Sequence, residues 1–155
     1  MTLPADVSSL LPHAPPMRFI HTLTSVDDAT VTCETTIDAD TFAPHLDEHR
    51  ELPAAYLVEI MAQTVAAWAG YHDRANKRPL SSGLFLSCRH FQTRISSLPL
   101  NTHLRIQGAK IIQDNLTATF ETQASLVHDD AAPFASSTLT THQISWERLA
   151  ELLKK

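Results

Sequence analysis

The sequence contains little of several residue types that mark whole classes of protein. Only 3 of its 155 residues are glycine and 9 are proline, whereas 43% are hydrophobic and 19% are charged. This composition excludes collagen-like, low-complexity and disordered chains, because enough apolar side chains are present to form a core. A chain of 155 residues also suits one domain, so we expect a single domain over residues 1–155.

Cysteine is equally scarce. Cys33 and Cys88 are the only two cysteines, and neither belongs to a CxxC pair or lies beside a histidine cluster. A disulfide framework and a zinc site are therefore not indicated. None of the 9 histidines has the HExxH spacing of a metal-binding helix, so we predict no metal site.

Positive charge is in deficit, and no apolar run is long. The chain has 12 Lys and Arg residues and 17 Asp and Glu residues. It therefore lacks the positive electrostatic field of a nucleic-acid-binding protein. Residues 1–6 have neither a basic start nor an apolar core, so we expect no export signal and a cytoplasmic location. The most apolar window, residues 54–70, is short for a membrane span and contains Glu59; it predicts a buried helix instead.

The chain does contain an ordered series of strand-like and helix-like segments. Residues 17–23 and 30–37 are rich in β-branched side chains and predict an antiparallel pair. Pro53 suits a first helical position, and a helix is expected from there to about Asn76. Further strands are predicted at roughly 84–94, 103–113, 117–127 and 134–144, with a short amphipathic helix at 146–155. Strands in runs around one long helix indicate an α+β fold with an antiparallel sheet.

The long helix is apolar on nearly all sides. At 100° per residue, small residues share the side of Glu59 and larger apolar residues lie opposite. The small residues are Ala55, Ala62, Ala66 and Gly70. We therefore expect a curved sheet to wrap this helix, and another backbone to approach its small face.

Two polar residues stand out from this framework. Glu59 lies in an apolar helix, where an ionised carboxylate is costly unless it is paired, hydrogen-bonded or protonated. Gln63, one turn later, could hold that carboxylate by a hydrogen bond. His45 precedes the helix in a loop that could fold back towards the helix start. From these residues alone, a surface position stays open for both Glu59 and His45.

Three segments carry a family resemblance: LLPHAPPM at residues 10–17, the Pro44-His45 pair, and LPAAYLVEIMAQ at residues 52–63. They resemble the landmarks of the dehydratases that act on 3-hydroxyacyl groups borne by acyl carrier protein. That family has the hotdog fold, a curved antiparallel sheet around one long helix. Its catalytic histidine and acid are separated by fourteen positions, as are His45 and Glu59. Residues 61–70 look most like the dehydratases of aryl polyene biosynthesis.

The resemblance implies roles for individual residues in a reaction that needs no cofactor. His45 would remove the C2 proton, and Glu59 would protonate the departing C3 hydroxyl. Gln63 would orient Glu59, and the backbone N–H of Ala54 would polarise the thioester carbonyl. Acyl carrier protein would deliver the substrate. We also expect a homodimer, or a heterodimer with a related dehydratase, either alone or within a higher oligomer, with histidine and acid supplied by different protomers.

Three positions depart from the family pattern. Pro44 replaces a glycine, Leu46-Asp47-Glu48 replaces Phe-Pro-Gly, and Ala54 replaces the glycine after the proline. The altered loop beside His45 keeps another interpretation open, a catalytically weak subunit that binds acyl chains or stabilises an active partner. An acyl thioesterase is a further alternative, since such hotdog enzymes commonly use a helix carboxylate to activate water.

Overall fold

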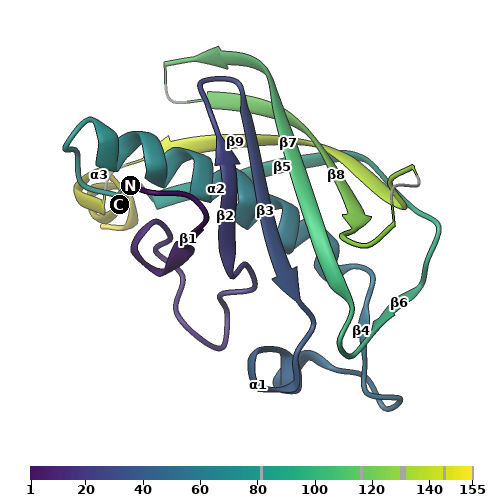
Figure 1. The fold of residues 1–155 in the computed structure, drawn as a ribbon. Helices are drawn as coiled ribbons and strands as arrows, with labels where there is room; N and C mark the ends of the chain where they lie inside the picture. The colour runs from purple at the N-terminus through teal and green to yellow at the C-terminus, as the bar shows by residue number, and fades with distance from the viewer. Residues whose placement is uncertain (81, 116, 130–131, 145, 155) are drawn as a thin grey trace.

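A curved antiparallel sheet wraps around one long helix, α2 (Tyr56–Ala75), in the computed structural model (Figure 1). The structure describes residues 1–80, 82–115, 117–129, 132–144 and 146–154. Seven strands form the sheet in the order β1-β2-β3-β7-β8-β9-β5. Their bounds are β1 Ala5–Asp6, β2 Thr22–Val26, β3 Thr30–Thr36, β5 Ser82–Thr93, β7 His103–Asp114, β8 Thr117–Leu126 and β9 Ala135–Ile144.

Short elements connect this framework. They are η1 (Val7–Ser9), α1 (Ala39–Phe42), η2 (Ala43–His45), a separate two-stranded pair of β4 (Glu51–Pro53) and β6 (Ser97–Pro99), and the C-terminal helix α3 (Trp146–Leu153). The α+β class, the long helix, the four later strands and the terminal helix are thus confirmed. None of the described helices combines the length and hydropathy that crossing a lipid bilayer requires.

Two predicted boundaries are wrong, for identifiable reasons. Pro53 is not the first helical residue, because it pairs with Ser97 in the β4–β6 ladder and the helix begins at Tyr56. The first long strand begins at Thr22 rather than at residue 17. Phe19 and Ile20 are fully buried as their apolar character requires. However, the N–H of Phe19 bonds to the side chain of Gln63 instead of a neighbouring strand.

The core lies between α2 and the concave face of the sheet. Alternate residues of β7 and β8, such as Leu104, Ile106 and Phe120, are fully buried, as expected for strands with one covered face. From the helix, Leu57, Met61 and Val65 are among the residues buried against them. This packing fixes which face of α2 turns away from the sheet, and that face carries Glu59.

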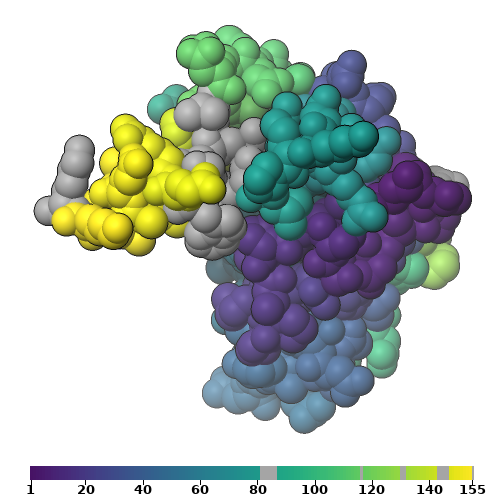
Figure 2. All heavy atoms as spheres, turned by 90° about the vertical axis from the view of Figure 1, so that its left-hand side faces the viewer, coloured from purple at the N-terminus to yellow at the C-terminus, as the bar shows by residue number. Residues whose placement is uncertain are grey.

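The N-terminal segment covers part of α2 that the sheet leaves open. Residues around Leu10 lie against the later turns of the helix, as the neighbouring purple and teal atoms of Figure 2 show. Leu10 and Leu11 are buried there. A Cβ atom added to Gly70 would lie 2.0 Å from the carbonyl oxygen of Leu10. The expected close approach of a backbone to the small helix face is therefore confirmed.

Gly70→Ala is expected to destabilise the protein. In an unobstructed helix this change would stabilise by about 1 kcal/mol, but here the new methyl group must displace a backbone carbonyl. We expect a net loss of about 1–3 kcal/mol, measured as a lower midpoint of thermal or denaturant unfolding. Gly108→Ala is the control, because the nearest atom there is a side-chain methyl of Val31 at 3.0 Å, and its loss should be smaller. An unchanged or raised midpoint for Gly70→Ala would contradict the close approach.

Candidate active site

The buried amide of Gln63 organises the face of α2 that points away from the sheet. Gln63 is 0% exposed. Its Oε1 accepts the backbone N–H of Phe19 at 2.8 Å, and its Nε2 donates to the carbonyl of Met17 at 2.7 Å. Nε2 also donates to Oε1 of Glu59 at 3.0 Å. Since an N–H can only donate and a carbonyl can only accept, these contacts fix the orientation of the amide.

Glu59 lies beside Gln63 and is less enclosed than the sequence indicates. Its side chain is 42% exposed, and Nε2 of His13 lies 3.6 Å from the same Oε1 that Gln63 contacts. The apolar environment expected for this carboxylate is therefore not present within one chain. His13 belongs to the LLPHAPPM segment, but its position in the sequence does not by itself indicate a role at Glu59.

His45 ends η2 and returns to the start of α2, as expected. Its Nε2 lies 3.0 Å from the carbonyl oxygen of Pro16. Its ring meets the ring of Phe19 edge-on at 4.9 Å and that of Tyr56 at 5.3 Å. Because the carbonyl can only accept, Nε2 carries the proton, and the lone pair of neutral His45 is on Nδ1.

The loop that differs from the family pattern has its own internal order. Oδ1 of Asp47 accepts the N–H of His49 at 2.8 Å and that of Glu51 at 3.0 Å. The N–H of Asp47 donates to the carbonyl of Glu51 at 2.8 Å, and Arg50 adopts a left-handed conformation with φ of 59°. An aspartate turn thus takes the place of the expected Phe-Pro-Gly sequence.

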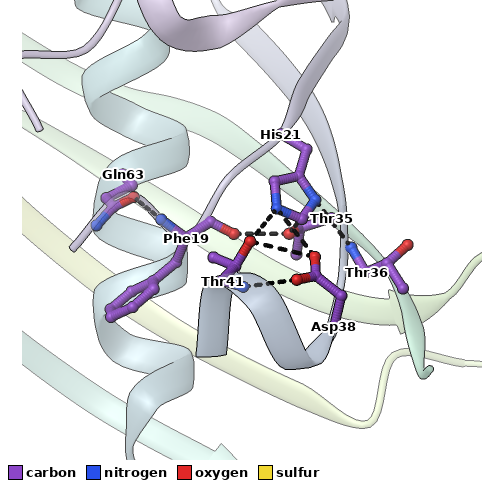
Figure 3. Close-up of polar contacts among 7 residues, drawn as sticks. All are labelled: Phe19, His21, Thr35, Thr36, Asp38, Thr41 and Gln63. Atoms are coloured by element: carbon purple, nitrogen blue, oxygen red, sulfur yellow. Dashed lines mark hydrogen bonds and ion pairs between the residues drawn. The ribbon is translucent and has the colours of Figure 1, made fainter. Parts of the chain in front are cut away.

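A polar network ties α1, the element before His45, to the sheet (Figure 3). Nδ1 of His21 accepts the N–H of Thr36 at 3.3 Å, which places the ring proton on Nε2. Nε2 lies 3.2 Å from Oγ1 of Thr41 and 3.5 Å from Oδ2 of Asp38, the N-cap of α1. Burial is the main cause of a lowered pKa for His21. The neutral imidazole of His21 therefore holds α1 in place, and η2, the turn that contains His45, follows α1 directly.

Phe19 joins the two halves of the candidate site. Its N–H bonds to Gln63, and its carbonyl accepts the hydroxyl of Thr35 at 2.6 Å. Its ring stacks on Phe42 at 5.2 Å and contacts His45. Among the described residues, no hydrogen bond or ion pair joins His45 directly to Glu59. One segment, residues 13–19, nevertheless contacts both.

The structure corrects the expected role of Ala54. Its N–H donates to the carbonyl of Ser96 at 3.0 Å, so this donor is occupied. The next N–H groups, those of Ala55 and Tyr56, have no acceptor among the described residues, whereas the N–H groups of Leu57 and Val58 are bonded. Ala55 is also exposed, while Ala54 is only 6% exposed. The open donors at the helix start lie one and two positions later than predicted.

Within the described part of the chain, no group of three or more His, Cys, Asp or Glu side chains could hold a metal ion. Burial raises the pKa of the Cys33 thiol to about 12, so this cysteine is an inert member of the core.

The family model for the ApeP dehydratase matches residues 5–154. The chain belongs to the ApeP-like family of dehydratases. The structure titled "The Dehydratase Heterocomplex ApeI:P from Xenorhabdus doucetiae" contains a chain that is 28% identical, with a TM-score of 0.89 and 100% of each chain covered. No curated protein matches the sequence.

Two further solved structures share the fold of this ApeP-like protein. A hypothetical thioesterase from Streptococcus pneumoniae TIGR4, solved with coenzyme A, is 14% identical, with a TM-score of 0.58. The alignment covers 79% of this chain and 84% of that one. The PaaI protein of Escherichia coli is 12% identical, with a TM-score of 0.57 over 77% and 80% of the two chains. These similarities confirm the hotdog fold.

Gln63→Leu is expected to destabilise this ApeP-like protein strongly. The change removes the partner of the buried Phe19 N–H, and an unsatisfied buried group costs about 1–3 kcal/mol. It also removes the partner of the Met17 carbonyl, but Met17 is 48% exposed and water can replace that bond. We expect a loss of about 1–3 kcal/mol in the free energy of unfolding, measured by denaturant titration. Gln123→Leu is the control, because Gln123 is exposed and should change stability by less than about 0.5 kcal/mol. Equal effects of the two substitutions would show that the buried amide does not hold the segment.

Proposed function

We propose that the protein dehydrates a 3-hydroxyacyl thioester, carried on acyl carrier protein, to the trans-2-enoyl thioester in aryl polyene or related fatty-acid-like biosynthesis. The observation that carries this proposal is the placement of His45 and Glu59. They have the spacing of the dehydratase family, and residues 13–19 contact both of them. Membership of the ApeP-like dehydratase family supports the reaction class.

The roles follow from which atoms are free. Nδ1 of His45 has the lone pair that takes the C2 proton, because Nε2 is bonded to Pro16. The electrons of the C2–H bond form the C2=C3 double bond, while the C3 hydroxyl takes a proton from Glu59 and leaves as water. The free N–H groups of Ala55 and Tyr56 donate to the thioester carbonyl, where negative charge develops. Hydration of the enoyl product follows the same steps in reverse.

The active site is completed between two subunits in this proposal. The resemblance to the dehydratase family implies that the reacting atoms lie between the histidine of one protomer and the acid of another. β5 supports such an assembly, because it ends the sheet and its outer edge is unpaired within the described chain. The similar ApeI:P structure is a heterocomplex, which supports a related dehydratase as the partner; a second copy of this chain is the alternative.

An accessory role is the second candidate function. The His45 loop lacks the family's Phe-Pro-Gly sequence, and Nε2 of His45 is occupied by a carbonyl of its own chain. In this alternative, the chain stabilises a catalytically competent partner and binds part of the acyl group.

One assay separates these functions. The purified protein, alone and with a related dehydratase subunit from its own organism, is incubated with 3-hydroxyacyl and enoyl thioesters. A change in enoyl absorbance in both directions is expected for a dehydratase. Release of free thiol would indicate a thioesterase. Activity that needs the partner subunit, and that persists when His45 and Glu59 of this chain are substituted, would indicate an accessory subunit.

His45→Ala and Glu59→Gln should each lower turnover by roughly 10²–10⁴-fold, the usual contribution of general acid–base catalysis. If the protein acts as a homodimer with shared sites, mixing the two variants should restore part of the activity. One of the two sites in a mixed dimer then keeps both groups. Subunit exchange is verified by mass labelling, and an exchanged mixture without any recovery would contradict sharing between copies of this chain.

Ala55→Pro tests the donor at the helix start. Ala55 has φ of −58°, which proline adopts readily at the beginning of a helix. Loss of this N–H should lower kcat by about 10²–10³-fold if it stabilises the thioester oxyanion. Ala55→Ser retains the N–H and is the control, expected to keep near-normal turnover. A folded Ala55→Pro protein with normal kcat would exclude this donor.

A further inference from the structure

His13 lies against the candidate acid, and the proposed mechanism does not use it. Its Nε2 is 3.6 Å from Oε1 of Glu59, the oxygen that also accepts the N–H of Gln63 at 3.0 Å. Oε2 of Glu59 has no hydrogen bond or ion pair among the described residues. Among the described residues, Gln63 and His13 thus both lie at Oε1 of Glu59, and Oε2 has no partner.

The surroundings of His13 indicate which of its ring nitrogens carries the proton. The side chain is 31% exposed, yet Nδ1 is buried and has no hydrogen-bond partner among the described residues. A proton on Nδ1 would leave a buried donor unpaired and would direct a lone pair of Nε2 towards the carboxylate. A proton on Nε2 instead lies on the nitrogen nearer to Glu59, 3.6 Å from Oε1. The Nε2–H form is therefore the favoured neutral tautomer.

The charge state of His13 follows from two opposing effects. Burial lowers its pKa, and the negative charge of Glu59 raises it by a smaller amount, so the net pKa is below the usual value for histidine. Glu59 is the charged group that acts on it, and Gln63, which shares the carboxylate oxygen, is neutral. His13 is consequently uncharged near pH 7.

We infer that His13 is a positioning residue that, together with Gln63, directs the reactive proton of Glu59 to Oε2. The N–H of Gln63 donates to Oε1, and the Nε2–H of His13 lies 3.6 Å from the same oxygen. Both favour Oε1 as the carbonyl oxygen of the protonated acid, so the O–H forms at Oε2. This inference rests on the proposed function, in which Glu59 is the general acid. Neutrality of His13 is essential, because a cation at this distance would favour the carboxylate and remove the acid.

The pH dependence of kcat for dehydration tests this role. His13→Arg should move the fall of activity at high pH to lower pH by about 1–3 units, because an adjacent cation favours the ionised form of a general acid. At the pH where the wild type is half active, kcat of His13→Arg should then be about 5-fold lower or more. His13→Gln keeps an N–H donor without charge and should retain the position of the fall. His49→Gln is the matched control, because the side chain of His49 is 76% exposed.

The inference is overturned if the profiles of His13→Arg and the wild type coincide. If the role of His13 is purely structural, every His13 variant should have a lower maximal kcat or a lower unfolding midpoint. The pH at which kcat falls should then stay unchanged. Failure of the proposed function is distinguishable, since the wild type would then show no dehydration with or without its partner.

Nitrogen NMR of the His13 ring in the assembled protein provides a readout that requires neither activity nor a His13 variant. We expect the Nε2–H tautomer at pH 7. We also expect a further lowering of the His13 pKa in Glu59→Gln, because the carboxylate charge raises that pKa. An Nδ1–H tautomer, or a His13 titration identical in both proteins, would contradict the inferred contact.

Discussion

The candidate site depends on the need of one buried amide for hydrogen-bond partners. Gln63 is fully enclosed in a mostly apolar helix, where each unpaired polar group would be costly. The backbone of Met17 and Phe19 satisfies it on one side and Glu59 on the other. The position of residues 13–19, and with it the surroundings of Glu59 and His45, follows from this requirement.

The same N-terminal segment also fills the space beside the later turns of the helix. Gly70 permits the carbonyl of Leu10 to approach more closely than any side chain would allow. Packing at Gly70 and hydrogen bonding at Gln63 therefore fix the segment at two points along α2. Between these points, His13 lies at Glu59, and the carbonyl of Pro16 is available to His45.

Part of the site was predictable from local spacing. Glu59 and Gln63 are four positions apart, so any helix brings them together, and their hydrogen bond confirms that expectation. The exposure of Glu59 was not predictable from this spacing. Glu59 lies on the face of α2 that the sheet does not cover, and the side chain of Glu59 is 42% exposed. The prediction of a free N–H at Ala54 was wrong because Ser96, distant in sequence and just before β6, supplies a carbonyl that accepts it.

The sequence by itself determined the order and type of the main elements, since alternation, helical periodicity and proline positions are local properties of the chain. It also determined the spacing of His45 and Glu59, through which the dehydratase resemblance was recognised. Only the tertiary structure decided that residues 17–21 leave the strand pattern and that His13 lies 3.6 Å from Glu59. It also decided that the N–H groups without an acceptor among the described residues are those of Ala55 and Tyr56. Those outcomes depend on which distant backbone groups satisfy a buried polar atom, and that pairing has no signature in a local run of residues.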